Sequence, residues 1–194
     1  MEHRIKHLVT VAIITSLLCF VIIWFISSKF IKIDLLDRLS YAVTLSTFFT
    51  AFYERFLWKY FTFCNKIPKI FGEYKVKIDY SYQDQCGTKM IDATIKQTYL
   101  TTKVFLTTDE ITSITLTSDI VKDNDEMILY YTYRTTPKMK FSKENPINLG
   151  ATRLVIKEDV LEGIYWTARN TVGDINMKKT LKLMSFLYFN ISLK

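Results

Sequence analysis

Histidine and cysteine are among the scarcest residues in this chain of 194 residues. The two histidines, His3 and His7, both precede the first apolar run, so the rest of the chain has none. This excludes His-based catalytic triads and His-ligated metal sites from the C-terminal part. The three cysteines, Cys19, Cys64 and Cys86, are too few and too scattered for a disulfide framework, and no Cys-x-x-Cys occurs.

The short signatures of common enzymes are also absent. The sequence has no Gly-x-Ser-x-Gly, no Gly-rich phosphate loop, no His-Glu-x-x-His and no dinucleotide fingerprint. The adjacent carboxylate pairs Asp109-Glu110 and Glu158-Asp159 both lie in predicted turns. We therefore expect that the protein is not an enzyme and that it uses no metal ion or cofactor.

The basic residues are unevenly distributed along the chain. The net formal charge is +7, of which residues 1–69 carry +5 and residues 70–194 only +2. A domain that binds nucleic acid without sequence preference is expected to carry its basic excess on its own folded surface. We therefore expect no DNA or RNA partner, because the basic excess lies beside apolar segments.

Two apolar runs occupy the N-terminal third. Leu8–Ser28 has 21 residues without a charge, enough to span a bilayer as a helix. A signal peptide is the alternative, but the run is long for one and no small-x-small cleavage site follows it. The second run, Leu39–Tyr53, has 15 uncharged residues and is followed by aromatic residues suited to a membrane interface. We predict a two-helix transmembrane hairpin over residues 1–65.

Lysine and arginine favour the two outer flanks of this hairpin over its connecting loop. The positive-inside rule then places the N-terminus and the C-terminal domain in the cytoplasm. In the second run, Ser40, Thr44, Thr47 and Ala51 share one helical face. Such small residues either pack on the first helix or mediate self-association between protomers.

Beyond the hairpin, residues 66–194 show the two-residue periodicity of strands. The predicted strands are Glu73–Gln83, Lys89–Tyr99, Lys103–Thr107, Thr112–Ile120, Glu126–Thr135, Thr152–Lys157, Leu161–Asn170 and Asp174–Leu193. The predicted turns are Gln85-Cys86-Gly87, Lys122-Asp123-Asn124-Asp125, Pro137, Asn145-Pro146, Asn148-Leu149-Gly150 and Val172-Gly173. Short strands without a convincing helix predict a small antiparallel β-barrel of about eight strands. The fold class is thus membrane-anchored all-β.

Polar and aromatic residues alternate along two of the predicted strands. In Leu161–Asn170, Tyr165, Thr167 and Arg169 share one face, and in Glu126–Thr135, Tyr131 and Tyr133 do so. Tyrosine offers a stacking surface with a hydrogen-bonding tip, and arginine suits phosphate. Together they suit a nucleotide-sized anionic ligand, while an ordinary barrel core with a solvated face is the alternative interpretation.

Several motifs recur in a fixed order along the chain. They are the membrane hairpin, Pro68-x-x-x-Gly72, Gln97-Thr98-Tyr99, Tyr131-x-Tyr133 before Pro137, Gly150-Ala151-Thr152, and Gly163-x-Tyr165-x-Thr167-x-Arg169-x-Thr171-x-Gly173. The set resembles the two-transmembrane β-barrel effectors of bacterial cyclic-oligonucleotide-based antiphage signalling (CBASS). This resemblance covers nearly the whole chain.

The resemblance implies a function. Such effectors bind a cyclic dinucleotide made by a partner nucleotidyltransferase, oligomerise in the bacterial inner membrane and disrupt it, which kills the infected cell. Their role parallels that of STING receptors. Carried over by motif, the expected ligand-binding residues are Gln97, Tyr131, Tyr133, Tyr165, Thr167 and Arg169.

Two other functional classes fit the same architecture. One is a constitutive membrane-anchored scaffold whose barrel binds a protein partner. The other is a tethered carrier of lipids or small hydrophobic molecules, which would need an apolar pocket rather than the polar face predicted here.

Overall fold

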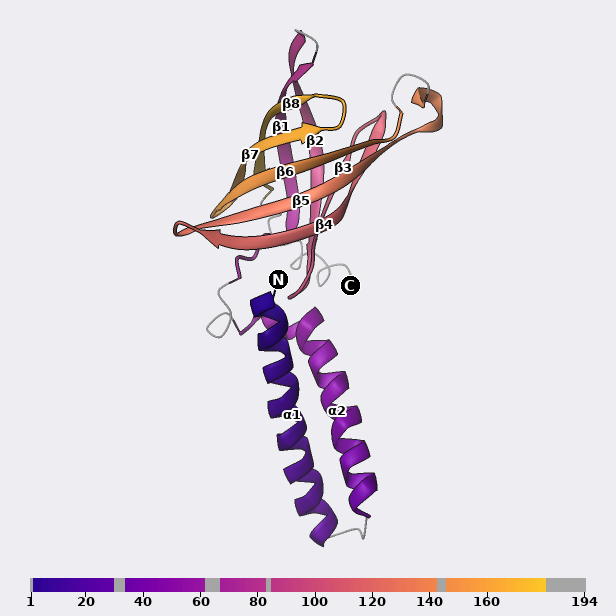
Figure 1. Ribbon diagram of the computed structural model, residues 1–194, viewed down its shortest axis with the longest axis vertical. Helices are drawn as coiled ribbons and strands as arrows, with labels where there is room; N and C mark the ends of the chain where they lie inside the picture. Colours follow the sequence, from indigo (N-terminus) through magenta and orange to yellow (C-terminus); the bar gives the residue numbers. More distant parts are fainter. Residues whose placement is uncertain (1, 30–33, 62–66, 83–84, 143–145, 181–194) are drawn as a thin grey trace, which may run out of the picture. The chain divides into compact units, whose positions relative to one another are not determined.

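The structure is a computed structural model that describes residues 2–29, 34–61, 67–82, 85–142 and 146–180. The chain divides into two compact units (Figure 1). The first comprises Met1–Lys69 together with Gln97–Thr102, and the second comprises Ile70–Lys96 together with Lys103–Lys194. The connection between two strands of the barrel thus belongs to the helical unit, so the units are not simply consecutive segments of the chain.

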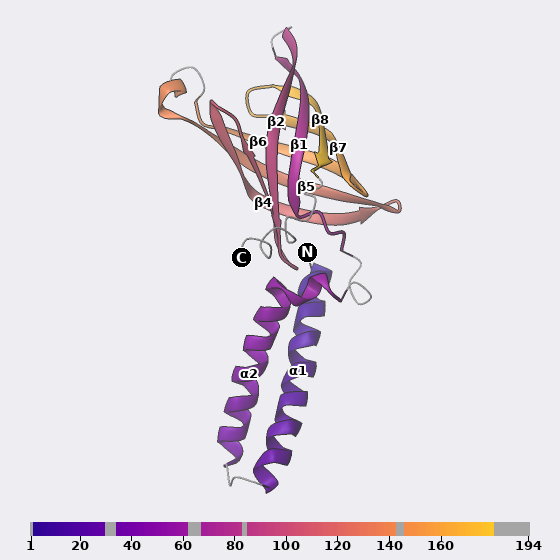
Figure 2. The ribbon, with the colours of Figure 1, turned by 180° about the vertical axis from the view of Figure 1, so that it is seen from behind.

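The first unit is a helical hairpin. Helix α1 spans Glu2–Lys29 and helix α2 spans Leu35–Arg55, followed by the short 3-10 helix η1 at Leu57–Lys59. The two long helices lie side by side in both views of the ribbon (Figure 2). The Asp34 carboxylate caps α2 by accepting a hydrogen bond from the Leu35 amide at 2.8 Å.

Small side chains of α2 face the partner helix, but they are not the predicted ones. Ala42 and Ser46 are buried, whereas Ser40, Thr44, Thr47 and Ala51 are exposed. The interpretation that these four exposed residues pack against the first helix is therefore wrong. The Thr44 and Thr47 hydroxyls donate to the carbonyls of Ser40 and Val43 within the same helix, each at 2.8 Å, so these two hydroxyls are paired although they are exposed.

The β2–β3 connection, Gln97–Thr102, packs into the helical unit, and we call it the clasp. The Tyr99 amide donates to the Glu54 carbonyl at 3.0 Å. The Arg4 guanidinium lies 3.5 Å and 3.4 Å from the carbonyl oxygens of Tyr99 and Leu100. The Tyr99 ring is buried with Tyr53 and Trp58 in one aromatic cluster. The clasp is thereby fixed to both helical ends of the hairpin.

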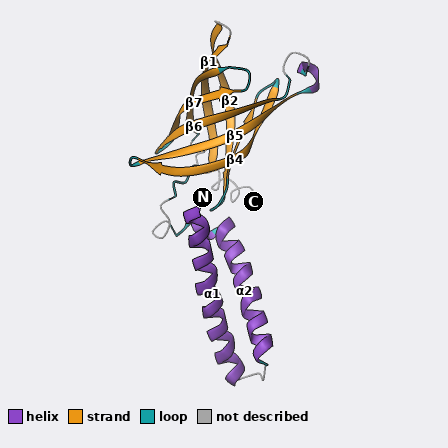
Figure 3. Ribbon diagram, viewed as in Figure 1, coloured by secondary structure: helices purple, strands orange, loops and turns teal. Residues whose placement is uncertain are grey.

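The second unit is a closed antiparallel barrel in which each strand pairs with its neighbours in sequence and β8 closes on β1 (Figure 3). This confirms the predicted eight-stranded fold. The short 3-10 helix η2, Met139–Phe141, follows β5. The strands are β1 Gly72–Tyr82, β2 Gln85–Gln97, β3 Thr102–Thr107, β4 Ile111–Asp123, β5 Glu126–Pro137, β6 Asn148–Lys157, β7 Val160–Thr167 and β8 Val172–Lys179.

The predicted turn at Lys122-Asp123-Asn124-Asp125 is confirmed, and it lies where the backbone adopts positive φ. Asn124 and Asp125 have φ of 44° and 69° in the hairpin between β4 and β5, as expected for a tight turn that matches strand twist. The predicted turn at Pro137 also coincides with the end of β5. Closure of the barrel leaves no edge strand in the sheet, which removes sites for aggregation.

Three predicted turns that contain glycine are wrong. Gly87, Gly150 and Gly173 all lie inside strands, where they pair with Tyr80, Tyr133 and Tyr165, respectively. At Gly87 and Gly150 a side chain would collide first with the neighbouring tyrosine ring, and at Gly173 it would collide first with the Asp79 carbonyl and then with the Tyr165 ring. The strand predicted to reach Asn170 ends instead at Thr167, and Ala168 and Arg169 form the following turn. Of the strand predicted at Asp174–Leu193, residues 181–193 lie outside the described residues, as do Cys64 and Asn145.

Candidate functional site

The barrel interior has a closed half and an open half. In the closed half, inward side chains from β1, β5, β6, β7 and β8 are completely buried and pack as an apolar plug. These residues are Val76, Leu129, Leu154, Leu161 and Met177. Towards the opposite ends of the same strands lies a cavity of about 360 Å³. A barrel of eight strands is wide enough to be filled by side chains or to hold one small ligand. This barrel is filled in one half and hollow in the other.

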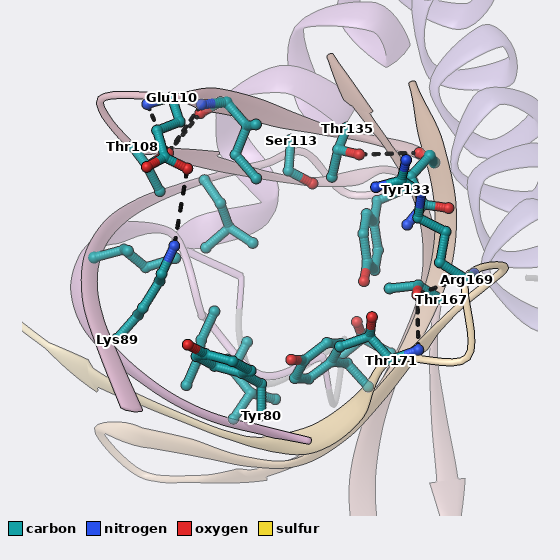
Figure 4. A pocket seen from close by; sticks show the side chains of 18 of the residues that line it. Tyr80, Lys89, Thr108, Glu110, Ser113, Tyr133, Thr135, Thr167, Arg169 and Thr171 are labelled. Carbon is teal, nitrogen blue, oxygen red and sulfur yellow. Dashed lines mark hydrogen bonds and ion pairs between the residues drawn. The ribbon is translucent and has the colours of Figure 1, made fainter. Parts of the chain in front are cut away.

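Tyrosines form much of the cavity wall (Figure 4). Tyr133 lies against Gly150: a Cβ placed on Gly150 would come within 2.4 Å of the Tyr133 phenol oxygen. Tyr165 likewise lies against Gly173, where a Cβ would approach its ring to 2.8 Å. These rings occupy the gaps that cross-strand glycines leave in the neighbouring strands. The sequence thus places flat, partly polar surfaces around the cavity at fixed positions.

We call three hydroxyl groups of the cavity lining its floor, because their side chains are almost completely buried. Ser113, Tyr131 and Thr152 are 4%, 3% and 2% exposed and all line the cavity. Burial raises the pKa of Tyr131 to about 12, and the neighbouring Thr152 hydroxyl partly offsets this rise. The two hydroxyls nevertheless do not meet in a hydrogen bond of acceptable geometry. Tyr131 is therefore a neutral phenol at physiological pH, able to donate a hydrogen bond.

Tyr133 and Tyr165 of the wall are also neutral. Burial raises the pKa of Tyr165 to about 12 and raises the pKa of Tyr133 further. Neutral rings can stack on a ligand without adding negative charge beside a phosphate.

The charged residues of the cavity lie at its mouth. Lys89 of β2 and Arg169 of the β7–β8 turn stand on opposite sides of the opening (Figure 4). Lys89 pairs with Glu110 at 3.9 Å, and the two side chains are 57% and 44% exposed. A pair so exposed contributes little to stability, so Lys89 is available to an anionic ligand at small cost.

Arg169 is positioned by the turn that carries it. The Thr167 hydroxyl accepts hydrogen bonds from the amides of Arg169 and Thr171, each at 3.3 Å. Asn170 has φ of 60°, a left-handed conformation that asparagine tolerates. Arg169 therefore reaches the mouth although it is no longer part of the strand.

Five of the six predicted site residues come together in this cavity. Tyr131, Tyr133, Tyr165, Thr167 and Arg169 all line it. Gln97 does not. It belongs to the helical unit, where its side-chain amide donates to the Pro68 carbonyl at 2.9 Å. That contact explains a glutamine at this position without a ligand.

Sequence reasoning missed other lining residues. Lys89 continues the inward face of β2, two positions before Ile91 and four before Ala93, so a lysine on an otherwise apolar face was the available signal. Thr152 lies in the Gly150-Ala151-Thr152 motif but was not recognised as a site residue. Ser113 carries no distinguishing signal in sequence, because it sits among other small hydroxyl residues of β4.

Comparison with known proteins places this barrel. Residues 65–179 match the family described as Cap15, cyclic dinucleotide receptor domain. The chain belongs to the Cap15 family. A protein of Staphylococcus schleiferi described as CD-NTase-associated protein 15 is 42% identical over 181 residues, which cover 92% of this chain and 99% of that protein. The family match over residues 65–179 includes every residue that lines the cavity.

Membership of the Cap15 family confirms the resemblance to CBASS effectors that the motif order indicated. The Cap15 match is to a receptor domain rather than to a catalytic family. Among the described residues, α1 is the helix that is both long and apolar enough to cross a membrane. Helix α2 has 21 residues but begins with a charged first turn, so its crossing stays a prediction.

Proposed function

We propose that this protein is a CBASS effector whose barrel cavity binds a cyclic dinucleotide made by a partner nucleotidyltransferase. The observation that carries the proposal is a tyrosine-walled cavity with two cations at its mouth, inside the region that matches a cyclic dinucleotide receptor domain. Tyrosine faces stack on nucleobases, and arginine suits the planar geometry of phosphate oxygens. The proposed contacts are Tyr131, Tyr133, Tyr165, Thr167 and Arg169.

We further propose that residues 1–65 anchor the protein in the bacterial inner membrane through both helices, with the N-terminus and the barrel domain, residues 66–194, in the cytoplasm. Large apolar side chains are exposed along both helices of the hairpin, including Leu17 and Phe25 of α1 and Leu36 and Phe48 of α2. Exposed apolar surface of this extent is unfavourable in water and favourable in lipid. The positions of α2 that face away from α1 thus fit a bilayer better than an aqueous surface.

Oligomerisation and membrane disruption form the output of the proposed function. The exposed stripe of Ser40, Thr44, Thr47 and Ala51 supports self-association, because small residues allow membrane helices to approach closely. A ligand promotes assembly only if it binds the assembled state more tightly than the monomer. The resulting oligomer would disrupt the membrane and kill the infected cell.

The test is a thermal-shift and calorimetric titration of the full chain in detergent micelles with cyclic di-GMP, cyclic di-AMP and cyclic di-UMP. A ligand at 100 times its Kd stabilises the fold by about 2.7 kcal/mol, which corresponds to roughly 5–10 °C for a chain of this size. Arg169→Ala should abolish the shift. Arg134→Ala is the matched control, since Arg134 is an exposed arginine on the outer face of β5.

No shift with any cyclic dinucleotide in a folded sample would overturn the receptor proposal and favour the membrane-anchored scaffold. A shift that survives in Arg169→Ala would keep the receptor proposal but remove Arg169 from the site. Linear dinucleotides provide the specificity control, because they carry the same bases and phosphate chemistry without the ring.

A further inference from the structure

The hydroxyls of the cavity floor are unusual within the barrel. Ser113 Oγ, Tyr131 Oη and Thr152 Oγ1 are buried, and none of them makes a hydrogen bond of acceptable geometry to the described residues, although the Thr152 hydroxyl lies close enough to Tyr131 to lower its pKa. They are the three such side-chain groups in the described part of the barrel unit. A buried hydroxyl without a partner costs free energy, so native proteins seldom keep one without a reason.

Two other buried hydroxyls of the same barrel form hydrogen bonds of ordinary geometry. Thr115 Oγ1 accepts a hydrogen bond from the Val104 amide at 2.9 Å and donates to the Val104 carbonyl at 3.1 Å. Tyr74 Oη donates to the Ile70 carbonyl at 2.8 Å. The unpaired groups therefore do not reflect a general looseness of the interior. They are confined to the surface that faces the cavity.

Charge is distributed differently between floor and mouth. The floor carries neutral hydroxyls, whereas Lys89, Glu110 and Arg169 are exposed at the mouth. Burying a phosphate on a floor without cations would cost far more than burying a neutral polar group. A cyclic dinucleotide bound in this cavity would therefore keep its phosphates at the mouth and insert an uncharged part into the interior.

The uncharged polar part of such a ligand is the edge of a nucleobase. Each hydroxyl can donate one hydrogen bond and accept others, so the floor can complement a base edge that alternates donors and acceptors. The rings of Tyr133 and Tyr165 in the wall offer surfaces on which the faces of the same base can stack.

This inference rests on the proposed function: we propose that one nucleobase of the ligand enters the barrel with its edge leading. Ser113, Tyr131 and Thr152 then form a subsite that recognises this base. The phosphodiester ring stays at the mouth between Lys89 and Arg169. These three residues determine base preference. Lys89 and Arg169 contribute affinity that is common to all cyclic dinucleotides, because every member of that class carries the same two phosphates.

The test compares Ser113→Ala, Tyr131→Phe and Thr152→Val in the full chain in detergent micelles, each removing a hydroxyl with little change in shape. Titration calorimetry measures the Kd of cyclic di-GMP, cyclic di-AMP and cyclic di-UMP. Each variant should weaken binding of the preferred ligand by roughly 3- to 10-fold. The ratio between its Kd and the Kd values of the other two ligands should move closer to one. Arg169→Ala should instead weaken all ligands that bind by a similar factor.

Tyr130→Phe is the matched control, since Tyr130 neighbours Tyr131 in β5 and points outward to solvent. The thermal midpoint without ligand should stay unchanged or rise in the three floor variants, because a buried hydroxyl without a good hydrogen bond costs free energy in the folded state. A fall in that midpoint would assign the hydroxyls to the fold and overturn the inference.

Unchanged base preference in all three floor variants would also overturn the subsite while leaving the receptor function intact, provided that Arg169→Ala still weakens binding. If the wild-type chain binds no cyclic dinucleotide at all, the proposed function fails first, and the subsite fails with it.

Discussion

The ring of Tyr80 occupies the space that a side chain at Gly87 would need. A Cβ placed on Gly87 would lie 2.5 Å from the phenol oxygen and 2.6 Å from the ring carbon that bears it, and the nearest atoms all belong to Tyr80. The two residues are directly paired between β1 and β2, and Tyr80 lines the cavity. The position of this part of the wall therefore depends on the absence of a side chain in the next strand.

Gly87→Ala should displace the Tyr80 ring into the cavity. We expect the free energy of unfolding to fall by roughly 1–3 kcal/mol, as for other overpacked sites, and ligand affinity to fall as well. Chemical denaturation and calorimetry measure the two effects.

A double-mutant cycle provides the control for Gly87→Ala. In the Tyr80→Ala background the clash is gone, so Gly87→Ala should have little further effect. Equal destabilisation by Gly87→Ala in both backgrounds would contradict a role for the Tyr80 ring.

The buried tyrosines predict a loss of stability at alkaline pH. Burial raises the pKa of Tyr131 to about 12, above the value of about 10 for tyrosine in an unfolded chain. Below pH 10 both states keep the proton, so stability is unaffected. Between pH 10 and 12 the unfolded state releases it first, and stability falls by roughly 2 kcal/mol for this residue alone.

Denaturation titrations between pH 8 and 12 test this behaviour. Tyr131→Phe should reduce the alkaline fall by about 2 kcal/mol, whereas Tyr130→Phe, on the exposed face of the same strand, should leave it unchanged. A wild-type stability that is constant up to pH 12 would show that Tyr131 ionises as easily in the folded state as in the unfolded one.

The clasp predicts a separation between ligand binding and membrane output. Tyr99 is anchored in the hairpin, and the chain on either side of it continues directly into β2 and β3. Tyr99→Ala should leave the Kd of the cavity within about twofold but reduce killing of cells that produce the ligand, since the cavity itself is intact.

Lys103→Ala, an exposed change next to the clasp, is the control for Tyr99→Ala and should alter neither property. Gln97→Ala can be measured in the same experiment. Because the Gln97 amide donates to the Pro68 carbonyl, we expect Gln97→Ala to keep ligand affinity and reduce killing, as Tyr99→Ala does, rather than to lose ligand binding as Arg169→Ala does. Loss of ligand binding in Gln97→Ala would return Gln97 to the binding site.

The exposed stripe of α2 predicts the helix face used for self-association. Thr44→Leu combined with Thr47→Leu should prevent close approach of neighbouring helices and reduce ligand-dependent oligomers, with ligand affinity of the monomer unchanged. Crosslinking in native-like vesicles measures the oligomers. Leu45→Phe enlarges an exposed residue on a different face of α2 and should have little effect. Normal assembly of the double variant would exclude this face.

The barrel and the helical hairpin were largely predictable because both depend on local patterns. A charge-free run of 21 residues predicts a long apolar helix, and α1 has that character. Alternation along β5 predicts which tyrosines point inward, because side chains alternate strictly along a strand. Asn124-Asp125 predicts a turn because both residues tolerate positive φ.

Only the tertiary structure determined which residues distant in sequence contact one another. Glycine permits a tight turn, and it also permits a ring to lie across the next strand, so the sequence around Gly87, Gly150 and Gly173 fits both and only strand register distinguishes them. Gln97 carries the same amide whether it meets a nucleotide or the Pro68 carbonyl 29 positions away. Ser113 becomes a site residue only because barrel closure brings it to one cavity with Tyr131 and Thr152. The sequence by itself determined the elements and their inward faces, whereas the pairing of those faces across the barrel determined the site.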